Sequence, residues 1–225
     1  MPRDERNPTV IDDDEDGLVA IGGRLDPKTV LYAYRHGIFP WPVPGLPMLW
    51  FSPQERAILE FDRLHIPRSL RQARRRSTLQ FTIDRAFPAV IRACAQVPRP
   101  NQEGTWITPD VIRTYTRLHE MGVAHSVEAW RDGELVGGVY GVDIDGAFAG
   151  ESMFYRESNA SKLALLFLID HLSSRGLDWM DIQMMTPHMA RLGARLISRG
   201  EFLSKLLETR RRGLKLFPHR QEVEA

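Results

Sequence analysis

The chain has 225 residues, of which 43% are hydrophobic and 26% are charged, and its formal net charge is +1. This length allows one large or two smaller globular domains with a buried core. The single cysteine, Cys94, excludes an internal disulfide and a cysteine-based zinc cluster. No signal peptide is visible, and the longest apolar run, residues 163–169, is too short to span a bilayer, so we expect a cytoplasmic protein.

Charge is unevenly distributed along the chain. Residues 1–17 carry seven acidic side chains, whereas residues 68–76 and 210–220 are basic clusters without an acid. One charged run is usually a solvated face, but two acid-free basic clusters in a nearly neutral protein favour contact with nucleic acid phosphates.

The first quarter of the chain predicts a helix, a loop and a strand. The acidic start is interpreted as a loose tail or an edge segment. A helix begins with Asp26 as its N-cap and ends at Gly37. Residues 39–53 contain five prolines, which exclude a helix interior or a central strand and predict a stiff surface loop. The side chains of residues 55–61 alternate in polarity, which predicts a strand.

The rest of the chain is dominated by an antiparallel meander and helices around it. Two Asp-Gly pairs, Asp132-Gly133 and Asp145-Gly146, stand between β-rich runs and predict tight type I′ turns. The stretch 124–183 therefore holds three antiparallel strands, a long helix and a further strand. Other predicted segments are helices at 67–76, 84–95 and 108–121, a strand at 79–83, and short closing helices around 187–192 and 201–212.

This order of elements indicates an α+β fold, with a small N-terminal α/β domain in residues 1–64 and an acetyltransferase-like (GNAT) domain in residues 65–225. The fold leaves the reaction open. Coenzyme A-dependent enzymes of this fold hold pyrophosphate in an Arg/Gln-x-x-Gly-x-Gly/Ala loop, and none of the 17 glycines completes that pattern. A coenzyme A-dependent N-acyltransferase and a non-catalytic tRNA-binding module are kept as alternatives.

Polar side chains in apolar strands are the first candidates for chemistry. Glu151 lies in the third strand of the meander, and Asp181 and Gln183 lie in the last strand. Burying a carboxylate in such a strand costs free energy, so it is expected to have a hydrogen-bond or ion-pair partner or a role in catalysis. Because side chains alternate along a strand, one sheet face could present all three. The structural alternative is that Asp181 pairs with an arginine such as Arg195, and that Glu151 caps a backbone amide.

Other reactive side chains do not form a recognisable motif. His119, His125 and His188 lack metal-ligand spacing and are expected to be structural, and Cys94 falls at a core position. No nucleophile elbow and no P-loop are present, so we expect neither a metal nor a cofactor.

Eight motifs, in order, resemble the leucyl/phenylalanyl-tRNA–protein transferase family over roughly residues 18–207. They are HGIFPWP, WFSPQERAIL, EGTWIT, LHEMGVAHSVEAW, ELVGGVYGV, FAGESMF, NASKLAL and DIQ. The resemblance implies a cytoplasmic bacterial enzyme that moves leucine or phenylalanine, and methionine less well, from aminoacyl-tRNA. The acceptor is the α-amino group of a protein that begins with arginine or lysine. The product is a degradation signal of the N-end rule pathway.

The resemblance also implies roles for individual residues. Asp181 and Gln183 match a pair that orients and deprotonates the attacking amine, with Asp181 either the base or an anchor for the acceptor's cationic end. Glu151 matches a glutamate that contacts an amino group in the site. The expected apolar pocket for the donor side chain consists of Val139, Phe148, Met153, Leu165, Leu172 and Met180. Because the donor is an activated ester and the acceptor amine has a pKa of ~8, positioning and one proton acceptor suffice.

The remaining contacts are expected to bind the tRNA end of the donor. Trp41 and Trp106 match the family's aromatic contacts to the 3′-terminal adenosine, and Tyr34 and Tyr115 are counted among the substrate-binding side chains. The basic helix would lie along acceptor-stem phosphates and give salt-sensitive affinity with little sequence reading. Its arginines are Arg68, Arg71, Arg74, Arg75 and Arg76.

Overall fold

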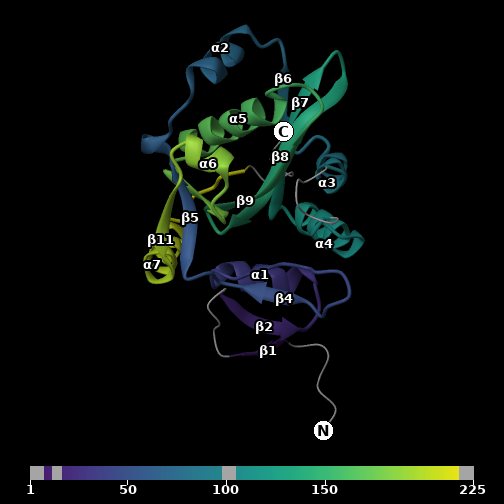
Figure 1. Ribbon diagram of the computed structural model, residues 1–225, viewed down its shortest axis with the longest axis vertical. Helices are drawn as coiled ribbons and strands as arrows, with labels where there is room; N and C mark the ends of the chain where they lie inside the picture. Colours follow the sequence, from purple (N-terminus) through teal and green to yellow (C-terminus); the bar gives the residue numbers. More distant parts are fainter. Residues whose placement is uncertain (1–7, 12–16, 98–104, 218–225) are drawn as a thin grey trace.

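The computed structural model describes residues 8–11, 17–97 and 105–217, which form two β-sheets stacked end to end (Figure 1). The smaller sheet is antiparallel, with strand order β1-β2-β4-β3. Its strands are β1 (Pro8–Val10), β2 (Leu18–Gly22), β3 (Phe39–Pro40) and β4 (Leu49–Phe51). The helix α1 (Pro27–Arg35) lies between this sheet and the larger one.

The helix α1 confirms the predicted start and end signals. The Asp26 carboxylate accepts hydrogen bonds from the backbone N–H groups of Lys28 and Thr29, both at 3.0 Å. This satisfies two of the free N–H groups at the helix start. Gly37 follows the helix with a φ of +74°, a conformation that costs glycine little.

The proline-rich segment 39–53 does not form a loop throughout, and the exclusion of a central strand is wrong. Leu49–Phe51 forms β4, which pairs with β2 on one side and β3 on the other. No proline lies inside β4, and Pro40 lies in the edge strand β3. The rule on prolines applies to individual positions, so the five residues between Pro47 and Pro53 leave room for a paired strand.

The larger sheet has seven strands in the order β11-β5-β10-β9-β8-β7-β6. Neighbouring strands are antiparallel except β9 and β10, which are parallel. The strands are β5 (Glu55–Glu60), β6 (Gln80–Ile83), β7 (Ala124–Arg131), β8 (Glu134–Ile144), β9 (Ala147–Tyr155), β10 (Trp179–Gln183) and β11 (Arg195–Ser198). The predicted meander is therefore confirmed, and β11 is an additional strand.

Both Asp-Gly turns confirm the type I′ prediction. Asp132 and Gly133 have φ values of +50° and +83°, and Asp145 and Gly146 have values of +53° and +97°. A positive φ at both central residues matches the right-handed twist of the flanking strands.

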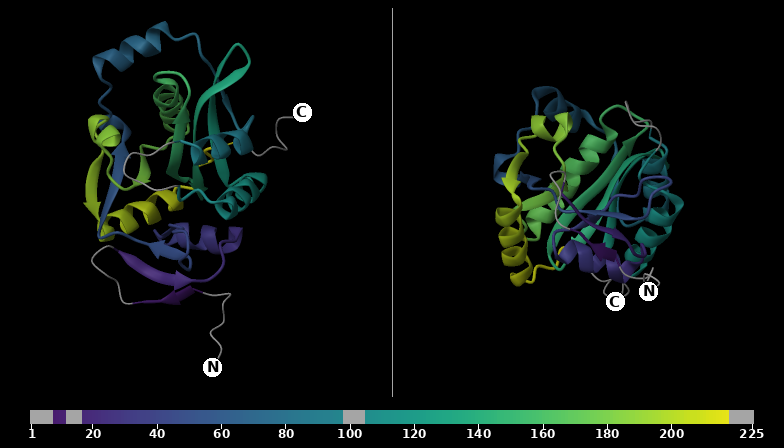
Figure 2. Two further views of the ribbon diagram at one scale, coloured as in Figure 1. Left: turned by 45° about the vertical axis from the view of Figure 1, so that its right-hand side comes forward. Right: turned by 60° about the horizontal axis from the view of Figure 1, so that its bottom comes forward.

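Helices cover both faces of the larger sheet. The long helix α5 packs on one face, and α3 and α4 pack on the other (Figure 1). The helix α2 stands at the end of the molecule that is far from the small sheet (Figure 2). The helices of this part are α2 (Arg68–Arg76), α3 (Phe87–Ala95), α4 (Pro109–Glu120), α5 (Ala160–Ser174), α6 (Pro187–Arg191) and α7 (Arg199–Arg211), with a 3-10 turn at Phe61–Arg63.

A network of ion pairs joins α1 to the larger sheet. Asp145, in the β8–β9 turn, accepts hydrogen bonds from Arg35 of α1 at 2.8 and 2.9 Å and from Arg210 of α7 at 2.8 and 3.2 Å. The hydrogen bonds from Arg35 hold the pKa of Asp145 below its usual range, and those from Arg210 act in the same direction. This network fixes α1, and with it the neighbouring residue Tyr34, against the meander.

The mixed α+β class is confirmed, while the domain boundary after residue 64 stays a prediction. Because β5 lies between β10 and β11, a boundary just before β5 separates the two sheets without cutting either. Within the described part of the chain, every helix is too short or too polar to cross a lipid bilayer.

Candidate active site

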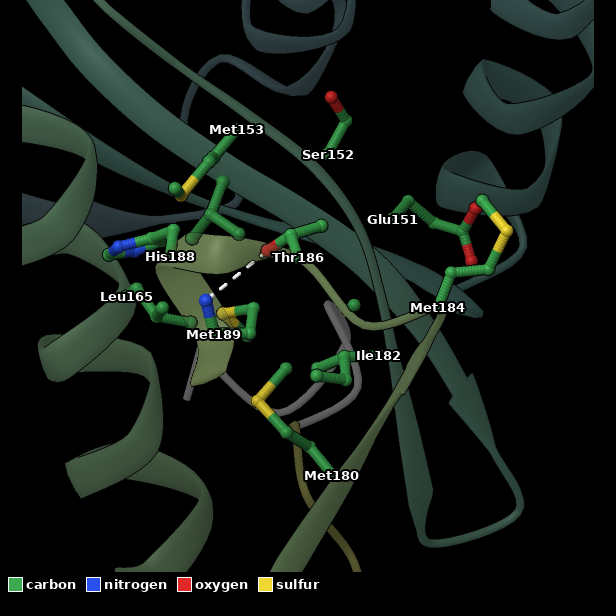
Figure 3. A pocket seen from close by; sticks show the side chains of 12 residues that line it. Glu151, Ser152, Met153, Leu165, Met180, Ile182, Met184, Thr186, His188 and Met189 are labelled. Carbon is green, nitrogen blue, oxygen red and sulfur yellow. Dashed lines mark hydrogen bonds between the residues drawn. The ribbon is translucent and has the colours of Figure 1, made fainter. Parts of the chain in front are cut away.

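A mainly apolar cavity of about 180 Å³ opens where the parallel strands β9 and β10 meet α5 and α6 (Figure 3). Its lining residues are Val139, Gly150, Glu151, Ser152, Met153, Leu165, Met180, Ile182, Met184, Thr186, His188 and Met189. Four of them are methionines, whose flexible thioethers adapt to different apolar shapes. Close packing favours glycine at position 150, because a Cβ there would lie 2.7 Å from the Met180 side chain.

Glu151 is the acid of this cavity, and its carboxylate is held by polar side chains from two other elements, α1 and β10. Its Oε1 accepts a hydrogen bond from the Tyr34 hydroxyl at 2.6 Å and from the Gln183 side-chain amide at 2.7 Å. The Tyr115 hydroxyl lies 2.6 Å from that of Tyr34. Since Tyr34 uses its proton on Glu151, Tyr115 donates to Tyr34. Among the described residues no group donates to the second oxygen, Oε2, which is left to accept a further hydrogen bond.

Burial raises the pKa of Glu151 to about 7. The hydrogen bonds from Tyr34 and Gln183 act in the opposite direction, because they stabilise the ionised form. Burial and the neighbouring carboxylate raise the pKa of the Tyr34 hydroxyl well above its usual range, so Tyr34 stays a donor at neutral pH. A carboxyl group that titrates near neutral pH can take and return a proton during a reaction.

Asp181 pairs with an arginine, as the structural alternative predicted, but the partner is Arg56 and not Arg195. It is buried and forms a two-fold ion pair with Arg56, with Arg56 Nε to Asp181 Oδ1 and Arg56 Nη2 to Asp181 Oδ2 both at 2.8 Å. Oδ1 also accepts from the backbone N–H of Gln183 at 2.9 Å. The predicted partner Arg195 is instead bound to Glu60 at 2.8 Å. Asp181 is therefore an anchor of the site, with both oxygens occupied.

Arg56 connects this pair to the small sheet. Its Nη1 donates to the carbonyl oxygen of Gly37 at 3.1 Å. Its guanidinium lies 4.7 Å from the ring centre of Phe39 and 4.5 Å from that of Phe202, within the range of cation–π contacts. A buried guanidinium with both an ion pair and ring contacts is well compensated for its loss of water.

Gln183 reaches Glu151 because β10 is irregular at its end. The pairing register shifts between Asp181 and Gln183, and Gln183 has a φ of +58°. The N–H of Met184 donates to the carbonyl oxygen of Ile182 at 2.7 Å, which closes a three-residue turn centred on Gln183. Non-glycine residues in this conformation cluster at functional sites. The predicted alternation therefore fails at this point, and the bulge directs the amide of Gln183 to Glu151.

Four of the six predicted pocket residues line the cavity, namely Val139, Met153, Leu165 and Met180. Phe148 and Leu172 do not, because both are buried in the core away from it. Phe148 packs against Phe217 instead, with ring centres 5.8 Å apart. Apolar periodicity marks buried positions and cannot distinguish a cavity wall from solid core.

The predicted adenosine-binding tryptophans come together although they are far apart in the sequence. The rings of Trp41 and Trp106 stack with centres 5.7 Å apart and planes 20° apart. Trp106 is buried at 8% exposure, while Trp41 is half-buried, so Trp41 is the more accessible of the two. Their role in binding a nucleotide stays a prediction.

The basic clusters separate into free and paired arginines. Arg68, Arg71, Arg75 and Arg76 line a hollow of about 510 Å³ on α2, while Arg74 pairs with Asp170 of α5. In the second cluster, Arg210 binds Asp145 and Arg212 binds Asp178. Arg220 lies outside the described residues. The surface of α2 is therefore the better candidate for phosphate contacts.

The histidines of the site region differ in their partners. His119 Nδ1 lies 2.8 Å from the carbonyl oxygen of Ala124, and His125 Nδ1 lies 2.7 Å from Asp84. His188 lines the cavity. Within the described ranges, no group of three or more potential metal ligands comes together.

Sequence reasoning missed several residues of the site. Arg56 stands in the apolar strand β5, so the signal that identified Glu151, a charge among apolar neighbours, also marks Arg56. Ile182 alternates with Met180 and could have been found in the same way. Met184, Met189 and His188 come from an irregular segment and a short helix, whose positions at the cavity no periodicity indicates.

Comparisons with known proteins find relatives over most of the chain. The model of the leucyl/phenylalanyl-tRNA protein transferase family matches residues 58–207, and that of its N-terminal domain matches residues 23–54. A leucyl/phenylalanyl-tRNA–protein transferase of Syntrophus aciditrophicus (strain SB) is 53% identical over 88% of this chain and 83% of its own length. A leucyl/phenylalanyl-tRNA–protein transferase of Chromobacterium violaceum is 50% identical over 85% of this chain and 82% of its own length.

Solved structures with some likeness include a ribosomal-protein-alanine N-acetyltransferase from Brucella melitensis biovar Abortus 2308. It is 19% identical with a TM-score of 0.32, covering 44% of this chain and 75% of that one. At this score the likeness carries no argument about the present fold.

These relatives show a transferase enzyme, and they do not support the coenzyme A-dependent or non-catalytic alternatives. The chain belongs to the leucyl/phenylalanyl-tRNA–protein transferase family.

Proposed function

We propose that the protein moves a leucyl or phenylalanyl group, and a methionyl group less well, from aminoacyl-tRNA to the α-amino group of a protein that begins with arginine or lysine. The observation that carries this proposal is the apolar cavity beside Glu151, whose carboxylate is held on one oxygen by Tyr34 and Gln183. The cavity suits an aliphatic or aromatic apolar side chain and disfavours a charged one, because a buried charge without a partner is costly.

In the proposed reaction, the amine nitrogen attacks the carbonyl carbon of the ester that links the amino acid to the tRNA ribose. The new N–C bond forms, the C–O bond to the ribose breaks, and a proton moves from the amine to the leaving oxygen. Oε2 of Glu151 is the group that takes and returns this proton, since Oε1 is held by Tyr34 and Gln183. Much of the remaining acceleration comes from holding the ester and the amine in place beside each other.

Asp181 supports this reaction without touching the reactants. Its carboxylate holds the backbone of Gln183 through the N–H at 2.9 Å, and Gln183 in turn holds Glu151. Asp181 is therefore a positioning residue, and the interpretation of Asp181 as the base is replaced by one in which Glu151 is the base.

The tRNA part of the donor is proposed to bind at two places. The stacked pair Trp41 and Trp106 offers a ring face to the terminal adenosine, where stacking on an aromatic side chain contributes about 1–3 kcal/mol. The arginines of α2 that do not face a carboxylate contact acceptor-stem phosphates. The acetyltransferase-type fold of the larger domain and a cytoplasmic location are parts of the same proposal.

Transfer of label from tRNA to defined peptides tests the reaction. We expect tRNA charged with radiolabelled leucine or phenylalanine to label a peptide that starts with arginine, while one that starts with alanine stays unlabelled. Valyl donors should be used less efficiently by a factor that corresponds to about 1–3 kcal/mol per missing methylene. Equal labelling of the two peptides would refute the proposed acceptor.

The salt dependence of tRNA binding tests the phosphate surface. Changing Arg71, Arg75 and Arg76 together to alanine should weaken binding and flatten its logarithmic salt dependence by roughly 0.7–0.9 per lost contact. Arg74→Ala is the matched control, because Arg74 is on the same helix but pairs with Asp170. An unchanged slope in the triple variant would place the phosphate contacts elsewhere.

A further inference from the structure

Four methionines line the apolar cavity, and they differ in how far solvent reaches them. Met184 is 44% exposed and Met180 is 1% exposed, while Met153 and Met189 are half-buried. Peroxides oxidise the thioether of methionine, and the oxidant must reach the sulfur to do so. The single cysteine, Cys94, is buried, so its thiol is shielded from the same oxidant. Met184 is therefore the sulfur-containing residue of the cavity that is most open to oxidation.

The backbone places Met184 at the entrance of the cavity, at the same end as the acid. Its N–H donates to the carbonyl oxygen of Ile182 at 2.7 Å, in the turn that follows Gln183 at the end of β10. The Gln183 amide in turn donates to Glu151 at 2.7 Å. Met184 and Glu151 both line the cavity, and Figure 3 shows them at the same end of it, away from His188. Met184 thus combines access to solvent with a position beside the reacting groups.

Hydrogen peroxide converts a thioether to a sulfoxide by transferring one oxygen atom. A lone pair of the sulfur forms a bond to one peroxide oxygen, the O–O bond breaks, and the other oxygen leaves as water after taking the proton. The sulfur is oxidised by two electrons and the peroxide is reduced by two. The side chain changes from apolar to polar, and its new oxygen accepts hydrogen bonds but has no proton to donate.

A sulfoxide at position 184 acts against the proposed reaction in two ways. An apolar donor side chain that enters the cavity meets a polar oxygen without a partner, which costs free energy. The same oxygen competes with Oε2 of Glu151 for the N–H groups of the incoming amine, because both are hydrogen-bond acceptors at one end of the cavity. Both effects lower the rate of transfer of an apolar amino acid.

We propose that Met184 is a modification site, at which oxidation by peroxide reversibly lowers transfer. The oxidation itself depends only on the folded chain, whereas its effect on transfer rests on the function proposed above. Reductases specific for the two sulfoxide epimers restore the thioether, and two thiols are oxidised to a disulfide as the oxygen leaves in water. The cavity then accepts apolar donors under reducing conditions and disfavours them in the presence of peroxide.

Limited treatment with hydrogen peroxide, followed by peptide mapping in a mass spectrometer, tests the site. Met121 is the internal reference, because it is 51% exposed, follows α4 and does not line the cavity. We expect Met184 and Met121 to be oxidised while Met180 stays reduced. Transfer of phenylalanine to a peptide that begins with arginine should fall about tenfold, within the range for an unpaired polar group in an apolar contact. Both reductases together with a thiol should restore the rate.

Two matched variants separate Met184 from the other side chains that peroxide reaches. Each variant is compared with its own untreated rate, so that a change in basal activity does not enter the result. Met184→Leu has a side chain of similar volume without sulfur, and its rate should stay within about twofold after treatment. Met121→Leu retains Met184 and should lose about tenfold, as the wild type does.

Any of four results would overturn the proposal. They are Met184 unoxidised when Met121 is modified, full activity of the wild type with Met184 as the sulfoxide, an equal loss in Met184→Leu, and a loss that both reductases leave unrestored. Absence of transfer by the untreated wild type falls instead on the proposed function, and the peptide map still shows whether Met184 is the residue that peroxide modifies.

Discussion

Glu151 and Asp181 lie on the neighbouring strands β9 and β10, yet their environments are opposite. Asp181 has both oxygens occupied by the Arg56 guanidinium and the Gln183 N–H. Among the described residues, Glu151 accepts hydrogen bonds only from neutral donors, and burial raises its pKa to about 7. The difference teaches that a cation at bonding distance makes a carboxylate a structural anchor. A carboxylate that is buried among neutral donors instead has a raised pKa, which suits a proton acceptor near neutral pH.

The largest expected effect is that of Asp181→Asn on stability. The change leaves the Arg56 guanidinium buried without its counter-charge, which costs about 3–5 kcal/mol of the free energy of unfolding. Denaturant unfolding of the purified variant measures this. Stability equal to that of the wild type would show that Asp181 is not the anchor described above.

Glu151→Gln should show the reverse pattern. We expect transfer in single-turnover measurements to fall by about 100-fold, because the proton acceptor is lost, with little loss of stability. The glutamine side chain retains the shape of glutamate and still accepts from Tyr34. A near-normal rate in the folded variant would remove Glu151 from the mechanism.

The pH dependence of stability sharpens the comparison. The pKa of Glu151 is raised in the folded state, so the folded protein holds a proton that the unfolded chain releases. Its contribution to stability is therefore fully present below the unfolded pKa and is lost as pH rises to about 7. Relative to Glu151→Gln, the wild type should lose about 1–3 kcal/mol across this window. Parallel stability curves for the two proteins would contradict the raised pKa.

The smallest effect is expected for Tyr34→Phe. Removing this hydroxyl takes away a donor that stabilises ionised Glu151, so the pKa of Glu151 should rise further. The stability cost should be about 2 kcal/mol, because the hydrogen bonds to Glu151 and from Tyr115 are both lost. The midpoint of the pH-dependent stability change should move to higher pH, and a shift to lower pH would show that Tyr34 does not donate to the carboxylate.

Much of the fold could be predicted from local sequence signals. The Asp26 cap, the two Asp-Gly turns and the long helix α5 depend on residues within a few positions of one another. Failures occurred where pairing with distant residues decided the outcome. β4 exists because β2 and β3 flank it, and β11 exists because β5 offers an edge.

The candidate site shows the same division. The sequence placed Glu151, Asp181 and Gln183 on two strands by their polarity among apolar neighbours. It could not show that Asp181 faces Arg56, 125 positions away, or that Glu151 faces Tyr34, 117 positions away. Nor could the sequence show the bulge at Gln183, because a bulge interrupts the alternation of side chains along a strand.

The sequence by itself therefore determined most of the elements, the turns and the family, because these depend on local conformational preferences and on short motifs. Only the tertiary structure decided which acid pairs with a buried cation and which accepts hydrogen bonds from neutral donors. Electrostatic interactions fall off with the distance between atoms, and chain packing alone sets those distances.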